Sequence, residues 1–306
     1  MQTIQSTRAL GRRDRLSQSQ RVMVGLTIAV LLVYYGLFFI FPILYAFVGS
    51  FFNWMPMKGR FDYIGLENYA KIFGNPTLWL SLKNTLVFTV VVMLLRTFLG
   101  LALAALINEL TRGKALLRTV YFIPVVTSTV AVSMVWSWLY EPSNGPINYL
   151  LSLIGMPRQM FLQDSGMALG CVMVMTVWKE LGYAMVVYMA GISGIPKSLY
   201  ESASIDGSTR WQSFRYITLP MLRSTTLFIL VTSFISYCQV FTQIDLMTSG
   251  GPNKATYTMV YMLYQEAFKS YRFGRASAIA FVLFVIIFVC SMAQIRMNRA
   301  KGGDAA

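Results

Sequence analysis

The segment PKSLYESASIDGSTRWQSFRYITLP, residues 196–220, is polar and lies between two apolar runs, near 167–191 and 222–245. Each run is long enough to cross a membrane as a helix. Of the 306 residues in the chain, 56% are hydrophobic and only 12% are charged. A soluble domain carries about twice that share of charged residues. The pattern therefore predicts an all-α integral membrane protein, in which apolar helices are joined by polar loops.

The polar segment itself predicts two short helices joined by a turn. Pro196 can begin the first helix, because proline suits the first helical position, and Asp206-Gly207 is a strong turn dipeptide. Ser208 or Thr209 can cap the second helix, and Pro220 can end it. On spacing alone, the segment is either an ordinary solvated loop or a pair of helices that a partner protein can approach closely.

Six apolar runs have the length of about 20 residues that a helix needs to cross the hydrocarbon core. We expect spans near residues 22–51, 84–107, 119–140, 167–191, 222–245 and 274–295. Pro42 predicts a kink in the first span. That run is too long for the core of a signal peptide, and it has no obvious cleavage site. The chain is thus expected to have a basic tail at 1–21, one membrane domain at 22–295 and a second tail at 296–306.

The lysine and arginine residues predict the orientation in the membrane. An even number of spans puts both termini on the same side. With the N-terminus inside, the cytoplasmic segments carry 15 of the 26 lysine and arginine residues, and the outer loops carry nine. Cytoplasmic loops of membrane proteins usually hold the excess of these residues. Both termini and residues 196–220 are therefore expected in the cytoplasm.

Several kinds of chemistry are excluded by residues and motifs that the sequence lacks. The chain has no histidine, which is the commonest metal ligand and general base. Its three cysteines, Cys171, Cys238 and Cys290, lie in apolar runs without C-x-x-C spacing, so we expect buried thiols rather than a disulfide or zinc site. No phosphate-binding loop and no nucleophile motif occurs. We therefore expect no catalytic residue, no metal site and no cofactor in this chain.

The fifth predicted span carries a stripe of hydroxyl and amide side chains, which recur at the spacing of one helical face. Such a stripe suits the passage of a neutral polyol or sugar, although hydrogen bonds between helices use the same residue types. The stripe consists of Thr225, Thr232, Ser236, Gln239 and Gln243, with Asp245 at its outer end.

Charged residues within the predicted spans are costly in lipid and should face the bundle interior or a cavity. Arg96 lies in the second span, with Asn84 at the outer end of that span. The arginine can meet an anionic group of a substrate, pair with a carboxylate across an interface, or lie on a water-facing side. Lys179 and Glu180 are adjacent in the fourth span, so we expect each to have a separate partner or water.

Two aromatic residues of the third span, Trp136 and Tyr140, are further candidates for the substrate pathway. Aromatic faces can stack on sugar rings, but packing in the core or at an interface is the stronger expectation for them. Together with Arg96, Asn84 and the polar stripe, they complete the candidate pathway.

Residues 201–220 resemble the EAA motif of inner-membrane permease subunits of binding-protein-dependent ABC importers. In that motif Glu-Ala-Ala is followed by three residues, Gly, nine residues, Ile, one residue and Leu-Pro. Here Glu201-Ser202-Ala203 is followed by Gly207 and then, after nine residues, by Ile217-Thr218-Leu219-Pro220. Ser202 stands where alanine is usual, which is a small departure.

The resemblance extends over roughly residues 22–295 and is specific to the carbohydrate-uptake group, which includes maltose, lactose and glycerol-3-phosphate permeases. It is carried by short segments in the first two spans, the first and last outer loops and the final span. These segments are Phe41-Pro42-Ile43, Gly65–Tyr69, Leu82–Leu86, Thr248–Pro252 and Gly274–Ala278.

The resemblance implies a type I ABC importer permease with six spans in a bacterial inner membrane. Such a subunit pairs with a second, homologous permease. Two ATPase subunits, which bind ATP and Mg²⁺, lie below the permeases, and an extracytoplasmic binding protein delivers the substrate. The motif would form the coupling helix that contacts one ATPase. Its residues here are Glu201, Ser202, Ala203, Asp206, Gly207, Ile217, Leu219 and Pro220.

The leading hypothesis is therefore a permease subunit of an ATP-driven importer for a sugar or sugar derivative. The alternative is a self-contained channel or gradient-driven carrier for a polar solute. That alternative accounts for the polar stripe and Arg96, but it does not account for the motif in residues 196–220.

Overall fold

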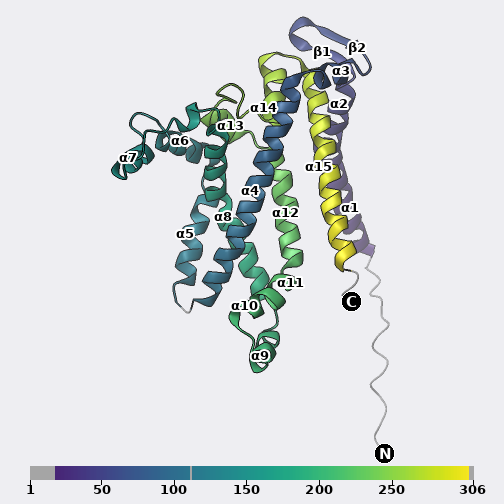
Figure 1. The fold of residues 1–306 in the computed structure, drawn as a ribbon. Helices are drawn as coiled ribbons and strands as arrows, with labels where there is room; N and C mark the ends of the chain where they lie inside the picture. Colours follow the sequence, from purple (N-terminus) through teal and green to yellow (C-terminus); the bar gives the residue numbers. More distant parts are fainter. Residues whose placement is uncertain (1–17, 111, 303–306) are drawn as a thin grey trace, which may run out of the picture. The chain divides into compact units, whose positions relative to one another are not determined.

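The computed structural model describes residues 18–110 and 112–302 of the chain, which divides into two units, residues 1–48 and 49–306 (Figure 1). The described part of the first unit is one helical stretch. It consists of α1 (Gln18–Tyr35), the π turn η1 (Gly36–Ile40) and α2 (Phe41–Gly49). Helix α1 thus begins within the tail predicted at 1–21, most of which lies outside the described residues.

A π turn precedes Pro42, where the sequence predicted a kink. Proline has no amide hydrogen and cannot bond to the carbonyl four residues earlier. Pro42 lies in the first turn of α2, directly after the wider turn η1, which accommodates the missing bond. The stretch Val22–Gly49 remains one helix that is long and apolar enough to cross a membrane.

The second unit contains the remaining helices and one small β-hairpin (Figure 1). Its longer helices are α4 (Pro76–Glu109), α5 (Lys114–Val126), α6 (Thr129–Leu139), α8 (Ala168–Ser193), α12 (Arg223–Cys238) and α15 (Phe273–Gly302). Its shorter elements are β1 (Phe52–Met55), η2 (Pro56–Lys58), β2 (Arg60–Tyr63), α3 (Glu67–Phe73), α7 (Pro146–Leu153), η3 (Phe161–Gln163), α9 (Lys197–Ile205), α10 (Arg210–Ser213), η4 (Phe214–Thr218), α11 (Leu219–Met221), α13 (Thr242–Met247), α14 (Met259–Tyr264) and η5 (Gln265–Lys269).

The all-α prediction omitted the β-hairpin. Strands β1 and β2 pair antiparallel, with Phe52 opposite Tyr63, and the rings of Phe52 and Phe61 stack 4.5 Å apart. The hairpin belongs to the first loop after the first predicted span, so the helical class of the membrane domain is unchanged.

Helices α4, α8 and α12 form the centre of the bundle and pack closely because small residues face their neighbours. A Cβ added to Gly100 of α4 would lie only 2.7 Å from the Cβ of Ala184 in α8. A Cβ on Gly182 of α8 would lie 1.9 Å from the carbonyl oxygen of Tyr121 in α5. Membrane helices commonly use small residues in this way to bring their backbones together.

The third predicted span, 119–140, is not one helix, which corrects the prediction. Helices α5 and α6 meet at an angle of 96°. Pro124 lies in the last turn of α5, and Thr127 has an extended backbone (ψ 144°). Because α5 ends at Val126, the carbonyl of Val125 has no amide of a following helical turn to accept from. It accepts a hydrogen bond of 3.1 Å from Lys179 Nζ instead. A cation at a helix C-terminus also stabilises the helix dipole.

The fifth predicted span, 222–245, is likewise interrupted, since α12 ends at Cys238 and α13 begins at Thr242. The break has a tertiary cause. The ring centre of Phe241 lies 5.0 Å from the ring centre of Tyr264 and 6.3 Å from that of Tyr261. The neighbouring Val240 is buried. The polar stripe therefore does not follow a single helical face.

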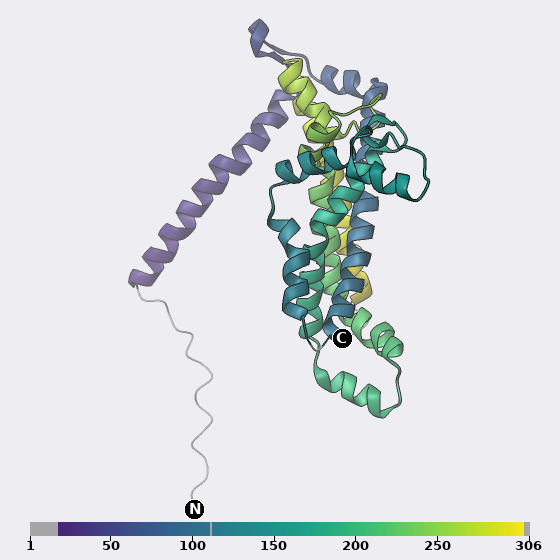
Figure 2. The ribbon, with the colours of Figure 1, turned by 90° about the vertical axis from the view of Figure 1, so that its left-hand side faces the viewer.

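The helical path that begins at Arg210 ends at Met221, one residue beyond the predicted stop at Pro220, and it meets α12 at 61°. It reaches Pro220 through the π turn η4, which again accommodates the missing proline amide. In the described chain, four helices can span a membrane, or six if each of the two bent pairs counts as one span. Figures 1 and 2 place α9 and α10 at the end of the bundle opposite α13 and α14.

Candidate functional site

The segment α9–α10 is a helical hairpin whose turn depends on a glycine. Gly207 has φ +78°, a left-handed conformation that L-residues with a side chain rarely adopt. Its amide donates to the Ser204 carbonyl (3.1 Å), and the Ser208 amide donates to the Ala203 carbonyl (2.9 Å). These two bonds form a Schellman motif, which satisfies the last carbonyls of α9. The predicted turn at Asp206-Gly207 is confirmed.

The second helix of the hairpin begins with a capping box. The Thr209 hydroxyl accepts from the Gln212 amide, and the Gln212 side chain accepts from the Thr209 amide. Of the two predicted caps, Thr209 is therefore the one used. Ser208 instead bonds through its hydroxyl to the hydroxyl of Ser213 at 3.0 Å. Local sequence signals thus define both ends of the turn.

The hairpin and the π turn η4 that follows it expose large apolar side chains, which distinguishes this segment from an ordinary solvated loop. Ile205 is 86% exposed, Trp211 is 70% exposed and Tyr216 is 75% exposed. Clustered apolar side chains at a surface are typical of contact sites. Five of the motif residues are exposed: Glu201, Ser202, Asp206, Gly207 and Pro220. The other three are half-buried: Ala203, Ile217 and Leu219.

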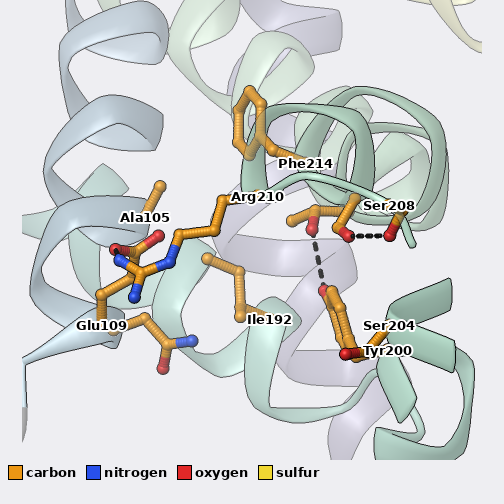
Figure 3. Close-up of a pocket in the computed structure, with 11 residues that line it drawn as sticks. Ala105, Glu109, Ile192, Tyr200, Ser204, Ser208, Arg210 and Phe214 are labelled. Atoms are coloured by element: carbon orange, nitrogen blue, oxygen red, sulfur yellow. Dashed lines mark hydrogen bonds and ion pairs between the residues drawn. The ribbon is translucent and has the colours of Figure 1, made fainter.

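A cavity of about 460 Å³ separates the hairpin from the ends of α4 and α8 (Figure 3). Across it, Arg210 of α10 and Glu109 of α4 point toward one another and form an ion pair of 3.0 Å. The Tyr200 and Thr218 hydroxyls, 2.8 Å apart, connect α9 to η4. The hairpin is thus tied to α4 by the ion pair and is continuous with α12 through η4 and α11.

A second cavity, of about 390 Å³, lies between α4, α8 and the α12–α13 break, and it brings together most of the predicted pathway. Thr232, Ser236, Gln239 and Gln243 all line it, although they belong to two helices and the break between them. Arg96 lines the same cavity from α4. The chain turns around the cavity, so the side chains converge without a continuous helix.

Arg96 of α4 is 5% exposed and is held by two other helices. Its Nε donates to the Glu180 carbonyl of α8 at 3.1 Å, and its Nη1 donates to the Ser233 hydroxyl of α12 at 2.9 Å. The guanidinium carbon lies 4.9 Å from the ring centre of Tyr183 and 5.7 Å from that of Tyr237. These distances permit cation–π attraction to both rings.

Lys179 has the separate partner that was expected, since its Nζ donates to the Val125 carbonyl, but it also lies 3.2 Å from Glu180 Oε1. The pairing of Lys179 with Glu180 was not expected, because adjacent helix positions do not face each other. Long side chains allow the two charged ends to meet all the same. The pair therefore neutralises itself beside the cavity.

Four predicted pathway residues do not line this cavity. Asn84 donates to the carbonyls of Lys254 and Tyr257 and so fixes the loop before α14. Trp136 packs 5.4 Å from Tyr140 and 5.6 Å from Trp178. Tyr140 lines a separate cavity of about 520 Å³ at the α13 end of the bundle. The fourth residue, Asp245, is also absent from the lining of the central cavity.

Sequence reasoning did not assign to the pathway several residues that line the central cavity. Thr176, Glu180 and Tyr183 project into it from α8, and Tyr237 projects from α12. The three α8 residues are spaced by four and three positions, which places them on one helical face. That periodicity was a signal that could have identified them beforehand.

Residues 96–300 match the model of the family described as "Binding-protein-dependent transport system inner membrane component". The trehalose/maltose transport system permease protein MalF of Thermococcus litoralis is 30% identical over 94% of this chain and 97% of its own length. The sn-glycerol-3-phosphate transport system permease protein UgpA of Pectobacterium atrosepticum is 30% identical over 87% of this chain and 90% of its own length.

Among solved structures, the fold is similar to a chain of a bacterial ABC transporter involved in the import of the acidic polysaccharide alginate. The TM-score is 0.82, with 25% identity over 92% of this chain and 96% of that chain. The same transporter has also been crystallised with an alginate pentasaccharide-bound periplasmic protein. The inward-facing MetNI methionine ABC transporter shares the fold alone, with 16% identity and a TM-score of 0.51.

Proposed function

Because this chain belongs to the family of inner-membrane components of binding-protein-dependent transport systems, we propose that it is the permease subunit of an ATP-driven importer for a sugar or sugar derivative. Family membership makes the chain a transport subunit of the inner membrane and not an enzyme. It also favours the importer subunit over the self-contained carrier. The sugar class is supported by the relatives named for trehalose/maltose and sn-glycerol-3-phosphate and by the alginate transporter.

In this proposal, the α9–α10 hairpin is the surface that docks on an ATPase subunit. The observation that carries it is the exposure of Ile205, Trp211 and Tyr216 on a hairpin whose turn is fixed by Gly207. Glu201, exposed on α9, supplies a carboxylate for a basic group of the partner. ATP and Mg²⁺ are held by that partner, and both termini of this chain lie in the cytoplasm.

The central cavity is the proposed substrate pathway. Hydroxyl and amide groups of Thr232, Ser236, Gln239 and Gln243 can exchange hydrogen bonds with the hydroxyl groups of a sugar. Ser236 and Gln239 are exposed in this chain, so the cavity is open along one side. A second, homologous permease closes that side in the assembled transporter.

The hairpin is mechanically connected to two of the helices that line the cavity, α12 and α4. The path from Arg210 to Met221 runs into α12, which carries Thr232 and Ser236, after a bend of 61°. The ion pair to Glu109 connects the hairpin to α4, which carries Arg96. When two ATPase subunits close on ATP, displacement of the hairpin is passed to α12 and α4 and changes access to the cavity.

The test is purification of the chain in mild detergent with its candidate partner subunits, followed by ATP-driven uptake in proteoliposomes. We expect the ATPase to co-purify. We expect Glu201→Lys to leave membrane insertion intact and to lower the number of solute molecules taken up per ATP hydrolysed. Uptake by the isolated chain without an ATPase would instead support the gradient-driven carrier.

A further inference from the structure

The central cavity contains a buried positive charge that has no carboxylate partner in this chain. Two charged side chains line it, Arg96 and Glu180, and Glu180 is paired at 3.2 Å with Lys179, which lies beside the cavity. Within residues 18–110 and 112–302, no aspartate or glutamate forms an ion pair with Arg96. Arg96, Lys179 and Glu180 together therefore carry a net charge of one positive unit, and the guanidinium without a carboxylate partner is 5% exposed.

We propose that the cavity is built for a solute that carries an anionic group, a carboxylate or a phosphate, and that Arg96 is the counter-ion of this group. The inference rests on the proposed function and specifies its substrate class as an acidic or phosphorylated sugar. A buried charge is costly unless it is paired and hydrogen-bonded. An anionic solute supplies the missing pair only while it occupies the cavity.

The hydrogen bonds at the cavity wall leave two groups available for such a solute. Arg96 uses Nε and Nη1 in bonds to the Glu180 carbonyl and the Ser233 hydroxyl. A guanidinium has five N–H donors, so these two bonds leave others for a solute in the cavity that Arg96 lines. The Tyr237 hydroxyl also belongs to a cavity residue, is buried and can donate to an anion. The oxygens of one carboxylate or phosphate can accept from both donors.

The arginine is oriented before any solute arrives. The Tyr183 and Tyr237 rings lie against the guanidinium, and the bonds to α8 and α12 fix its plane. A planar, pre-oriented guanidinium is well suited to carboxylate and phosphate recognition. The neutral amides and hydroxyls of Ser236, Gln239 and Gln243 then remain for the sugar hydroxyls.

A purely structural role for Arg96, as a tie between α4, α8 and α12, predicts different behaviour. Such a tie depends on hydrogen bonds, so its loss lowers stability equally with and without a solute. A counter-ion role predicts that affinity for anions depends on the charge, whereas affinity for neutral sugars does not. Tyr237→Phe separates the two roles, because it removes the hydroxyl but keeps the ring beside the guanidinium and the bonds from Arg96 to Glu180 and Ser233.

The experiment uses the assembled transporter in detergent, without nucleotide or binding protein. Binding of glucuronate, glucose 1-phosphate and glucose is measured by the shift of the thermal unfolding midpoint with concentration, in wild type, Arg96→Lys, Arg96→Gln and Tyr237→Phe. We expect one or both anions to bind at least about tenfold more tightly than glucose, because hydrogen bonds to charged groups are stronger. The preferred anion distinguishes a carboxylate site from a phosphate site.

We expect Arg96→Gln to abolish the preference for anions and Arg96→Lys to keep part of it. Tyr237→Phe should lower anion affinity several-fold without lowering the unfolding midpoint of the solute-free complex. It serves as the deciding variant if Arg96→Gln does not assemble. Equal binding of glucose and both anions, no binding of any probe, or an unchanged preference in these variants would overturn the inference. ATPase co-purification and ATP-driven uptake would still test the proposed function independently.

Discussion

Replacing Gly207 tests whether the shape of the hairpin turn, rather than its surface chemistry, is needed for coupling. The residue has φ +78°, and an added Cβ would meet nothing within 4 Å. The cost of a side chain at this position is therefore entirely conformational. The left-handed region costs an L-residue about 1–2 kcal/mol, and asparagine tolerates it better than a β-branched residue does.

A penalty of 1–2 kcal/mol corresponds to a factor of about 5–30 in a two-state equilibrium. Gly207→Val should therefore lower the population of the correctly formed turn by roughly that factor if the turn is only marginally stable. We expect uptake per ATP hydrolysed, measured in proteoliposomes, to fall strongly for Gly207→Val and only slightly for Gly207→Asn. The amount of chain inserted into the membrane should not change.

Gly113 provides a matched control. It also has a left-handed backbone, with φ +79°, and an added Cβ would likewise meet nothing within 4 Å. It precedes α5 and lies outside the hairpin. Gly113→Val should therefore carry a similar backbone penalty with little loss of coupling. Wild-type coupling in Gly207→Val, or equal losses in the Val and Asn variants, would refute the reasoning.

Three further predictions concern the cavities and the α5–α6 break. Gln239→Leu should lower uptake more than it lowers assembly with the partner subunits; unchanged uptake would assign the residue to packing. Arg210→Glu should weaken coupling, and the Arg210→Glu/Glu109→Arg double variant should restore it. The free energy of unfolding should change by less than about 1 kcal/mol, because the pair is exposed. A double variant that couples no better than the single variant would exclude a role for this contact. Lys179→Met should lower the free energy of unfolding by about 1–3 kcal/mol, because the Val125 carbonyl and the Glu180 carboxylate both lose a donor. An unchanged thermal unfolding midpoint would show that Lys179 does not stabilise the end of α5.

The hairpin could be predicted from the sequence because its determinants are local. Gly207 satisfies the left-handed position at the end of α9, and Thr209 with Gln212 forms the cap of α10 three residues apart. Each signal lies within a few residues of the structure that it specifies. The stop expected at Pro220 is equally local, since the helical path that begins at Arg210 ends one residue later, at Met221.

The interruptions of the third and fifth spans could not be predicted in the same way, because distant residues stabilise them. Lys179 supplies the donor for Val125 from a position 54 residues away. Phe241 is held by rings that follow it by 20 residues or more along the chain, those of Tyr261 and Tyr264. Hydropathy identifies apolar runs of the right length, but it carries no information about these contacts.

The candidate pathway was predicted correctly as a set of residue types but not as a geometry. Gln239 and Gln243 were expected on one continuous helical face, whereas a break in the helix lies between them. Arg96 was recognised as unusual, but its surroundings depend on Tyr183 and Tyr237 from two other helices. Such convergence is a property of the tertiary fold and has no local signature.

The central claim is that the α9–α10 hairpin contacts an ATPase subunit, and site-specific photocrosslinking in the assembled transporter tests it most directly. A photoreactive residue would replace Ser202, which is exposed on α9, and in a control Ser152, which is exposed on α7 near the other end of the bundle (Figure 1). We predict that the probe at position 202 crosslinks to the ATPase and that the probe at position 152 does not. A hairpin probe that never labels the ATPase, or that labels the extracytoplasmic binding protein instead, would contradict the account.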